Sequence, residues 1–169
     1  MVVGLTGGIG SGKTTVLNMF KEVGNVAVYN ADIEAKKIMT TSKAVHDNLI
    51  EAFGEECFIN GNLNKPYIAT IVFSDQEKLA ILNGIVHPEV GRHFQDFVEA
   101  NQDKEYVIYE NAILFENQSN SLCDIIITVS ADIETKIERV MKRDHVTRQE
   151  VVNRMNSQWS DIKKILQSN

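Results

Sequence analysis

The order of apolar and polar positions predicts strands that alternate with helices. Continuous apolar runs at 2–6, 26–29, 106–109 and 125–129 predict four strands. Runs without a polar position at every second residue are typical of parallel strands that are buried on both faces. Apolar residues at helical spacing follow several of these runs. The pattern therefore predicts a three-layer α/β fold, with a parallel sheet and helices on both of its faces.

A long helical block interrupts this alternation between about 41 and 101. Thr41 or Ser42 can cap its first helix, and Ser74-Asp75-Gln76-Glu77 forms a capping box for a later one. Pro88 lacks a backbone N–H and disfavours the helical conformation of His87, so we expect a break or kink there. The block is interpreted as an insertion beside the sheet and a natural place for a substrate pocket.

A glycine-rich stretch joins the first strand to the first helix. It reads Gly7-Gly8-Ile9-Gly10-Ser11-Gly12-Lys13-Thr14-Thr15 and fits the phosphate-binding pattern of Gly, four residues, then Gly-Lys-Ser/Thr. Glycines let consecutive backbone N–H groups point inward, where these groups and the helix dipole can hold phosphate oxygens. Lys13 is expected to reach the β- and γ-phosphates, and the Thr14 hydroxyl to bind Mg²⁺. The sequence thus predicts a nucleoside triphosphate site.

The overall charge changes this interpretation little. The 169 residues carry a net charge of −6, which argues against non-specific binding to nucleic acid. Cys57 and Cys123 form no metal-ligand pattern and are expected to be buried free thiols. The sequence shows neither a signal peptide nor an apolar span of 18 residues. We therefore expect a cytoplasmic protein that does not bind membranes. The sequence does not fix the oligomeric state, and a monomer is compatible with it.

Two acidic residues follow predicted strands. In open parallel sheets the ligand crevice lies beyond the carboxyl ends of the strands. Asp32 is expected at such an end, where a carboxylate can orient an attacking hydroxyl or accept its proton; the alternative is a helix N-cap. Glu110 ends the strand near 106, where it can direct Mg²⁺ or lie in a solvated loop.

Basic residues concentrate late in the chain. Six of the 17 Lys and Arg residues lie between 136 and 154, with Arg139 and Arg143 on one helical face. Ser130 is expected to cap that helix, and Thr147-Arg148-Gln149-Glu150 is a second capping box. The cluster is either a solvated face or, as we favour beside a phosphate loop, a mobile lid. Lys163 and Lys164 are expected to be an ordinary surface pair.

Several stretches resemble the dephospho-coenzyme A kinase family. The first is Gly4–Thr14, which contains the loop, and the second is Asn30-Ala31-Asp32, where the family usually has Asp-Ala-Asp. His87-Pro88 matches the helical substrate region of the family, and Ile113-Leu114-Phe115-Glu116 is similar to its Pro-Leu-Leu-Phe-Glu. Arg139–Asp144, with Val146-Thr147-Arg148, resembles its lid. The resemblance covers nearly the whole chain. It implies a P-loop NTPase fold in which the strand near 106 lies between the first two. It also implies that ATP, with Mg²⁺, phosphorylates the ribose 3′-hydroxyl of dephospho-coenzyme A.

The resemblance extends these role assignments to more residues. Asp32, Lys13, Arg139 and Arg143 would be catalytic. The residues that would bind ATP are Gly7, Gly8, Gly10, Ser11, Gly12, Lys13, Thr14 and Thr15. Thr14 and Glu110 would bind Mg²⁺. The residues that would bind the acceptor are Asp32, Lys36, His87, Phe115 and Glu116. Residues 1–40 and 102–130 would form the nucleotide-binding core, 41–101 the helical substrate domain, 131–157 the lid and 158–169 a C-terminal helix.

Three positions depart from the family. Asn30 replaces its first Asp, and Lys36 stands where Arg is frequent, which removes bidentate geometry. The sequence stops at Asn169, where the family continues into a strand similar to Val-Ile-Asp-Asn and a closing helix. Either further residues follow, or the sheet has one strand fewer.

Other functions are compatible with a phosphate loop. A related small-molecule kinase, such as a nucleoside monophosphate kinase, is the nearest alternative, followed by a non-catalytic ATP-binding module. A regulatory GTPase would need Asn-Lys-x-Asp, whereas Asn64-Lys65-Pro66-Tyr67 lacks the Asp.

Overall fold

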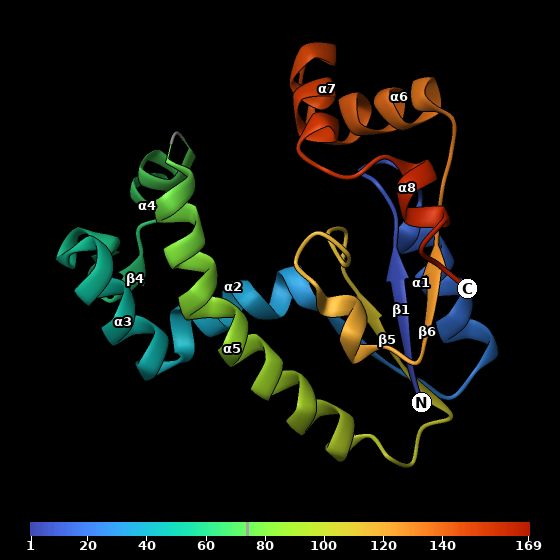
Figure 1. Cartoon of the computed structure of the whole chain (residues 1–169), viewed down its shortest axis with the longest axis horizontal. Helices are drawn as coiled ribbons and strands as arrows, with labels where there is room; N and C mark the ends of the chain where they lie inside the picture. The colour runs from blue at the N-terminus through green and yellow to red at the C-terminus, as the bar shows by residue number, and fades with distance from the viewer. Residues whose placement is uncertain (74) are drawn as a thin grey trace. The chain divides into compact units, whose positions relative to one another are not determined.

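The computed structural model describes residues 1–73 and 75–169 and divides into two compact units (Figure 1). Residues 1–30 and 101–169 form the first unit, which contains the parallel sheet. Residues 31–100 form the second unit, which is mainly helical.

The sheet has four parallel strands in the order β2-β5-β1-β6. They are β1 (Val2–Thr6), β2 (Val26–Asn30), β5 (Tyr106–Glu110) and β6 (Ile125–Thr128). Leu5 pairs with Glu110 on one side of β5, and Asn30 pairs with Glu110 on the other. The predicted α/β fold is confirmed, including the place of the 106 strand between the first two.

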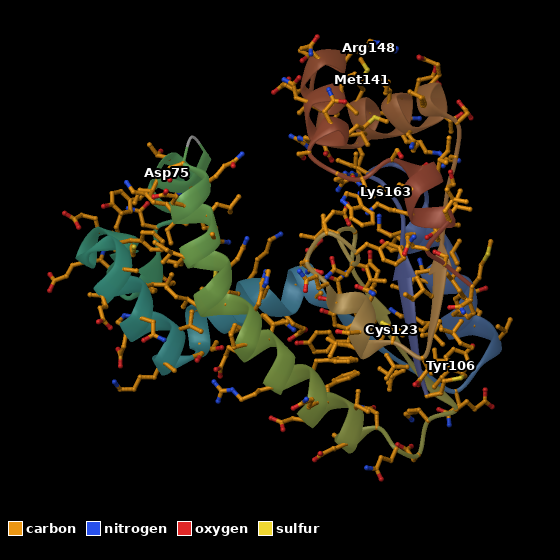
Figure 2. The ribbon with its side chains drawn as sticks, in the orientation of Figure 1. Asp75, Tyr106, Cys123, Met141, Arg148 and Lys163 are labelled. Carbon is orange, nitrogen blue, oxygen red and sulfur yellow. The ribbon has the colours of Figure 1, made fainter. Side chains whose placement is uncertain are left out.

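Both faces of the sheet are covered within the first unit. On one face, Leu5 and Ile108 pack against Leu17 of α1 (Lys13–Val23). Neighbouring residues of a strand point to opposite faces, so Gly4 lies on the other one. There a Cβ atom on Gly4 would lie 2.8 Å from Cys123 Sγ, so the segment before β6 covers the strand closely. Figure 2 labels Cys123 in this segment.

Three helices complete the first unit, beyond the carboxyl ends of the strands (Figure 1). They are α6 (Ile133–Asp144), α7 (Arg148–Asn156) and α8 (Asp161–Ile165), and a short 3-10 helix (Ser119–Leu122) precedes β6. The capping box that begins at Thr147 is confirmed. The prediction that Ser130 caps α6 is wrong, because the Asp132 carboxylate accepts the Thr135 N–H at 2.8 Å and the helix begins at Ile133.

The second unit is a helical bundle with a small hairpin. Its helices are α2 (Ala31–Thr41), α3 (Lys43–Phe53), α4 (Lys65–Phe73) and α5 (Gln76–Ala100), with a 3-10 helix at Glu55–Cys57. The first three pack against α5. The hairpin of β3 (Phe58–Ile59) and β4 (Asn62–Leu63) was not predicted. Its turn residues Asn60 and Gly61 both adopt positive φ.

The long helix α5 corrects one expectation. We expected a break or a kink at Pro88; the helix continues through Pro88 without a break, and Figure 1 shows that it bends along its length. The capping box predicted at Ser74 lies outside the described residues; Asp75 Oδ1 accepts the Glu77 N–H at 3.0 Å. No helix in the described part of the chain is long and apolar enough to cross a membrane.

Candidate active site

The glycine-rich loop follows β1 and turns directly into α1. A Cβ atom on Gly7 would lie 2.2 Å from the Val129 carbonyl oxygen, and one on Gly10 would lie 2.5 Å from that of Lys136. Both glycines also have positive φ, 146° and 80°, which residues with a side chain rarely adopt. The loop is therefore tightly enclosed by β6 and α6, and its backbone path requires glycine at these positions.

The N-terminus of α1 lacks the side-chain groups that usually neutralise a helix end. No side chain caps Gly12, and the first turn contains no acidic residue. By contrast, Ser42, Asp132, Thr147 and Ser160 cap α3, α6, α7 and α8. The Ser11 hydroxyl is buried and has no hydrogen-bond partner in residues 1–73 and 75–169. An uncapped helix end and a polar group of this kind fit a bound phosphate.

Lys13 folds back over the loop. Its Nζ donates to the carbonyl oxygens of Gly7, at 2.7 Å, and Gly8, at 3.4 Å. The ammonium group is thereby held against the backbone of the loop. The adjacent Thr14 and Thr15 side chains are exposed, so the Thr14 hydroxyl is accessible to a metal ion.

Glu110 ends β5 and faces Asn30 across the neighbouring strand. The Asn30 side-chain amide donates to the Glu110 carboxylate. Within the described ranges, no three His, Cys, Asp or Glu side chains form a metal cluster. Mg²⁺ in nucleotide sites commonly takes only one or two protein ligands besides phosphate and water. Thr14 and Glu110 are compatible with such a sparse donor set.

The two arginines predicted for the lid differ in their surroundings. Arg139 reaches the loop: its Nη1 lies 3.3 Å from the Gly10 carbonyl oxygen and 3.5 Å from that of Ser11. The Arg143 side chain is 62% exposed and pairs with Asp144 at 2.6 Å. Asp144 also binds Arg154 at 2.9 Å, so one carboxylate holds two arginines, one from α6 and one from α7.

Phe115 and Glu116 contact the C-terminal segment. Both Glu116 carboxylate oxygens accept from Lys164 Nζ, at 2.7 and 2.9 Å, and one also accepts the Trp159 N–H at 2.7 Å. The Phe115 ring stacks on Trp159 with the centroids 5.9 Å apart. Lys164 is fully buried, so the expectation of a Lys163–Lys164 surface pair is wrong for its second member.

The remaining predicted site residues belong to the helical unit. Asp32 is the second residue of α2, inside its first turn, so it does not occupy the N-cap position that was the alternative to a catalytic role. Lys36 is exposed on the same helix. His87 lies midway along α5, and the partial burial of its imidazole lowers its pKa.

Comparison with known proteins decides the family. The family model described as dephospho-CoA kinase matches residues 1–169. The chain belongs to this family. It is 36% identical to a dephospho-CoA kinase of Bacteroides fragilis over 162 residues, which cover 96% of this chain and 78% of the relative. It is 38% identical to the Fusobacterium nucleatum dephospho-CoA kinase over 166 residues, covering 98% and 84%.

Solved structures support the fold. The crystal structure of TT1252 from Thermus thermophilus matches with a TM-score of 0.88 and 30% identity, covering 99% of this chain and 85% of that one. The dephospho-CoA kinase from Campylobacter jejuni matches with a TM-score of 0.69 at 21% identity, with the same coverage. Membership of the dephospho-CoA kinase family thus agrees with a P-loop NTPase fold.

Sequence reasoning missed several residues around the loop. Lys136 and Asp161 form a buried pair, and Gln158 binds the loop backbone. None of them has a local signal in the sequence, because each acts through a partner far away in the chain.

Proposed function

We propose that the chain transfers the γ-phosphoryl group of ATP to the ribose 3′-hydroxyl of dephospho-coenzyme A, the last step of coenzyme A synthesis. The observation that carries this proposal is the family match over all 169 residues. The phosphate loop supports it, because an uncapped helix end, a lysine above it and a nearby arginine suit a triphosphate.

In this proposal the loop holds ATP and the lid completes the site. Residues 7–15 bind the phosphates through backbone amides, and Lys13 neutralises the β- and γ-phosphates. Arg139 already contacts the loop, whereas Arg143 would have to leave Asp144 to reach the same charge. Residues 131–157 therefore act as a lid whose arginines stabilise the charge of the transferring group.

The residues at the carboxyl ends of the strands fit Mg²⁺. Thr14 and Glu110 would hold the ion, which neutralises charge on the phosphate oxygens when bound. Asn30 orients Glu110 by donating to its carboxylate. In the acceptor half-site, Asp32 orients the 3′-hydroxyl and accepts its proton as that oxygen attacks the γ-phosphorus and the bond to ADP breaks.

The helical unit would supply most acceptor contacts. His87 is assigned to the nucleotide or pantetheine portion, and Lys36, Phe115 and Glu116 are also assigned to substrate binding. Glu116 would then act while bound to Lys164, which fixes its carboxylate. We place the reaction in the cytoplasm, with a small molecule and no nucleic acid or membrane as partner.

One assay tests the proposal against its nearest alternative. ADP release is measured with ATP, Mg²⁺ and either dephospho-coenzyme A or a panel of nucleoside monophosphates, and the product is checked for a 3′-phosphate. We expect turnover only with the coenzyme precursor. Turnover with a nucleoside monophosphate would point to the related kinases, and ATP binding without any transfer would point to a non-catalytic module.

A further inference from the structure

A buried ion pair supports the phosphate loop from outside. Lys136 of α6 is only 5% exposed, and its Nζ lies 2.6 Å from Asp161 Oδ2 at the start of α8. The Ser130 hydroxyl donates to the same oxygen at 2.7 Å. Burial would raise the pKa of Asp161, but the hydrogen bonds from Lys136 and Ser130 outweigh it and hold that pKa below its usual value.

This pair touches the loop directly. A Cβ atom on Gly8 would lie 2.9 Å from Asp161 Oδ1, so the carboxylate lies against the Gly8 backbone, whose N–H contributes to its low pKa. The Lys136 carbonyl oxygen occupies the space beside Gly10. The Asp161 carboxylate and the Lys136 backbone carbonyl therefore lie against the loop, at positions two residues apart, and an ideal Cβ atom on Gly8 would also lie 3.7 Å from Lys136 Nζ.

Gln158 adds a third contact. Its Oε1 accepts the Ile9 N–H at 3.0 Å. Gly8, Ile9 and Gly10 are thus each fixed by a different group from outside the loop. A cavity of about 470 Å³ lies beside these contacts, with Lys136, Asp161 and Gln158 on its wall. If one partner of the ion pair is removed, the other charge remains with little water to solvate it.

We propose that Lys136, Asp161 and Gln158 are positioning residues that hold the phosphate loop in the shape that binds ATP. A loop whose amides already point at the phosphates loses less conformational freedom on binding than a loose one. This inference rests on the proposed function only in taking ATP as the ligand, because the three residues contact the loop and take no part in phosphoryl transfer.

Removing one partner tests the idea first. We expect Lys136→Met to raise the dissociation constant for ATP by about tenfold or more, the size of effect expected from one disrupted buried hydrogen-bond system. The same substitution should lower Tm, and the KM for dephospho-coenzyme A should stay near the wild-type value. Gln158→Met, which leaves the ion pair intact, should also weaken ATP binding, with a smaller loss of Tm.

The double variant Lys136→Met/Asp161→Leu separates positioning from stability. Replacing both members of a buried ion pair with apolar residues often restores stability. We expect Tm to recover while ATP binding stays about tenfold weaker than in the wild type, because leucine cannot place a carboxylate against the Gly8 backbone. If Tm and ATP affinity recover together, the pair is merely structural and the inference is wrong; unchanged affinity in all three variants would also overturn it.

The matched control is an exposed pair in the helical unit. Lys43 and Asp47 interact at 2.6 Å, and their side chains are 88% and 54% exposed. Lys43→Met/Asp47→Leu should change neither Tm nor ATP affinity appreciably. Calorimetry with ATP alone measures the dissociation constant for ATP and so tests the inference without dephospho-coenzyme A. Wild-type protein that binds ATP but phosphorylates no coenzyme precursor would contradict the proposed function and leave this inference standing.

Discussion

Asn30 donates a hydrogen bond to Glu110 across two parallel strands, at the edge of the sheet where both strands end. An aspartate at position 30 could only accept, so Asn30→Asp would place two carboxylates against each other. We expect this variant to lose about 1–3 kcal/mol of unfolding free energy at pH 7.

The pH dependence of that variant identifies the cause. A neighbouring negative charge raises the folded-state pKa of one carboxyl above its unfolded value. The folded state then binds more protons than the unfolded state, so the loss of stability should shrink as pH falls from 7 toward 5. Chemical denaturation at several pH values measures this, and a loss that does not change with pH would contradict the explanation.

Lys13 is expected to matter for phosphate binding and not for the core. Its contacts are to the loop carbonyls of Gly7 and Gly8. Lys13→Ala should reduce kcat by about 10²-fold or more, as for other charge-stabilising donors. Tm without nucleotide should change little. A large loss of Tm would show that the lysine holds the loop together even in the absence of phosphate.

Asp32→Asn tests the catalytic carboxylate. Asparagine is nearly isosteric, and losing one charge in the first turn of α2 costs at most about 1 kcal/mol. We expect normal folding and ATP binding, with turnover of dephospho-coenzyme A reduced by about 10²–10⁴. Undiminished turnover in the variant would keep the family assignment and remove Asp32 from the mechanism.

Arg139→Met/Arg143→Met tests the lid. We expect kcat to fall by about 10³-fold or more, as for other arginines that neutralise a transferring phosphoryl group, with a smaller effect on the KM of the acceptor. Lys37 and Lys43, whose side chains are 61% and 88% exposed, supply a control pair of equal charge change. An equal loss in Lys37→Met/Lys43→Met would mean that net charge alone explains the effect.

Cys123 is expected to react slowly with thiol reagents. Burial, together with the nearby Asp124 carboxylate, raises the pKa of its thiol to about 11. Burial also raises the pKa of Cys57. Only about a thousandth of Cys123 is then thiolate at pH 8, and the thiolate is the reactive form. Of the two thiols that were expected to be buried, Cys57 is buried and Cys123 is intermediate in exposure. Labelling of Cys123 with a disulfide reagent should be slow in native protein and fast in guanidinium; rapid native labelling would contradict the raised pKa.

The sequence predicted the sheet and loop well because their signals are local. Apolar runs placed the four strands to within a residue at each end, and the spacing from Gly7 to Thr14 placed the loop between β1 and α1. Thr147 with Glu150 predicted a helix start correctly for the same reason. At Pro88, tertiary packing kept the helix continuous despite the missing N–H, which a local rule cannot foresee.

The residues that brace the site were not predictable in this way. Lys136 was counted in a basic face and Lys164 in a surface pair, yet both are buried. Each is neutralised by one carboxylate, Asp161 or Glu116, which lies 25 or 48 residues away. A periodic pattern indicates which face of a helix is apolar, but it cannot indicate that one carboxylate far away in the sequence pairs with a lysine. Only the fold reveals which lysines are interior.

The stacked aromatic pair has an optical consequence. Trp159 is the single tryptophan of the chain. Its indole stacks with the Phe115 ring, and the Lys163 ammonium lies 3.3 Å from the indole centroid. It directly follows Gln158, whose side chain binds the phosphate loop. All tryptophan emission therefore originates beside the phosphate loop, close in the chain to residues 131–157, the proposed lid. The protein carries its own fluorescent reporter, at a position where nucleotide-induced movement would change the surroundings of the indole.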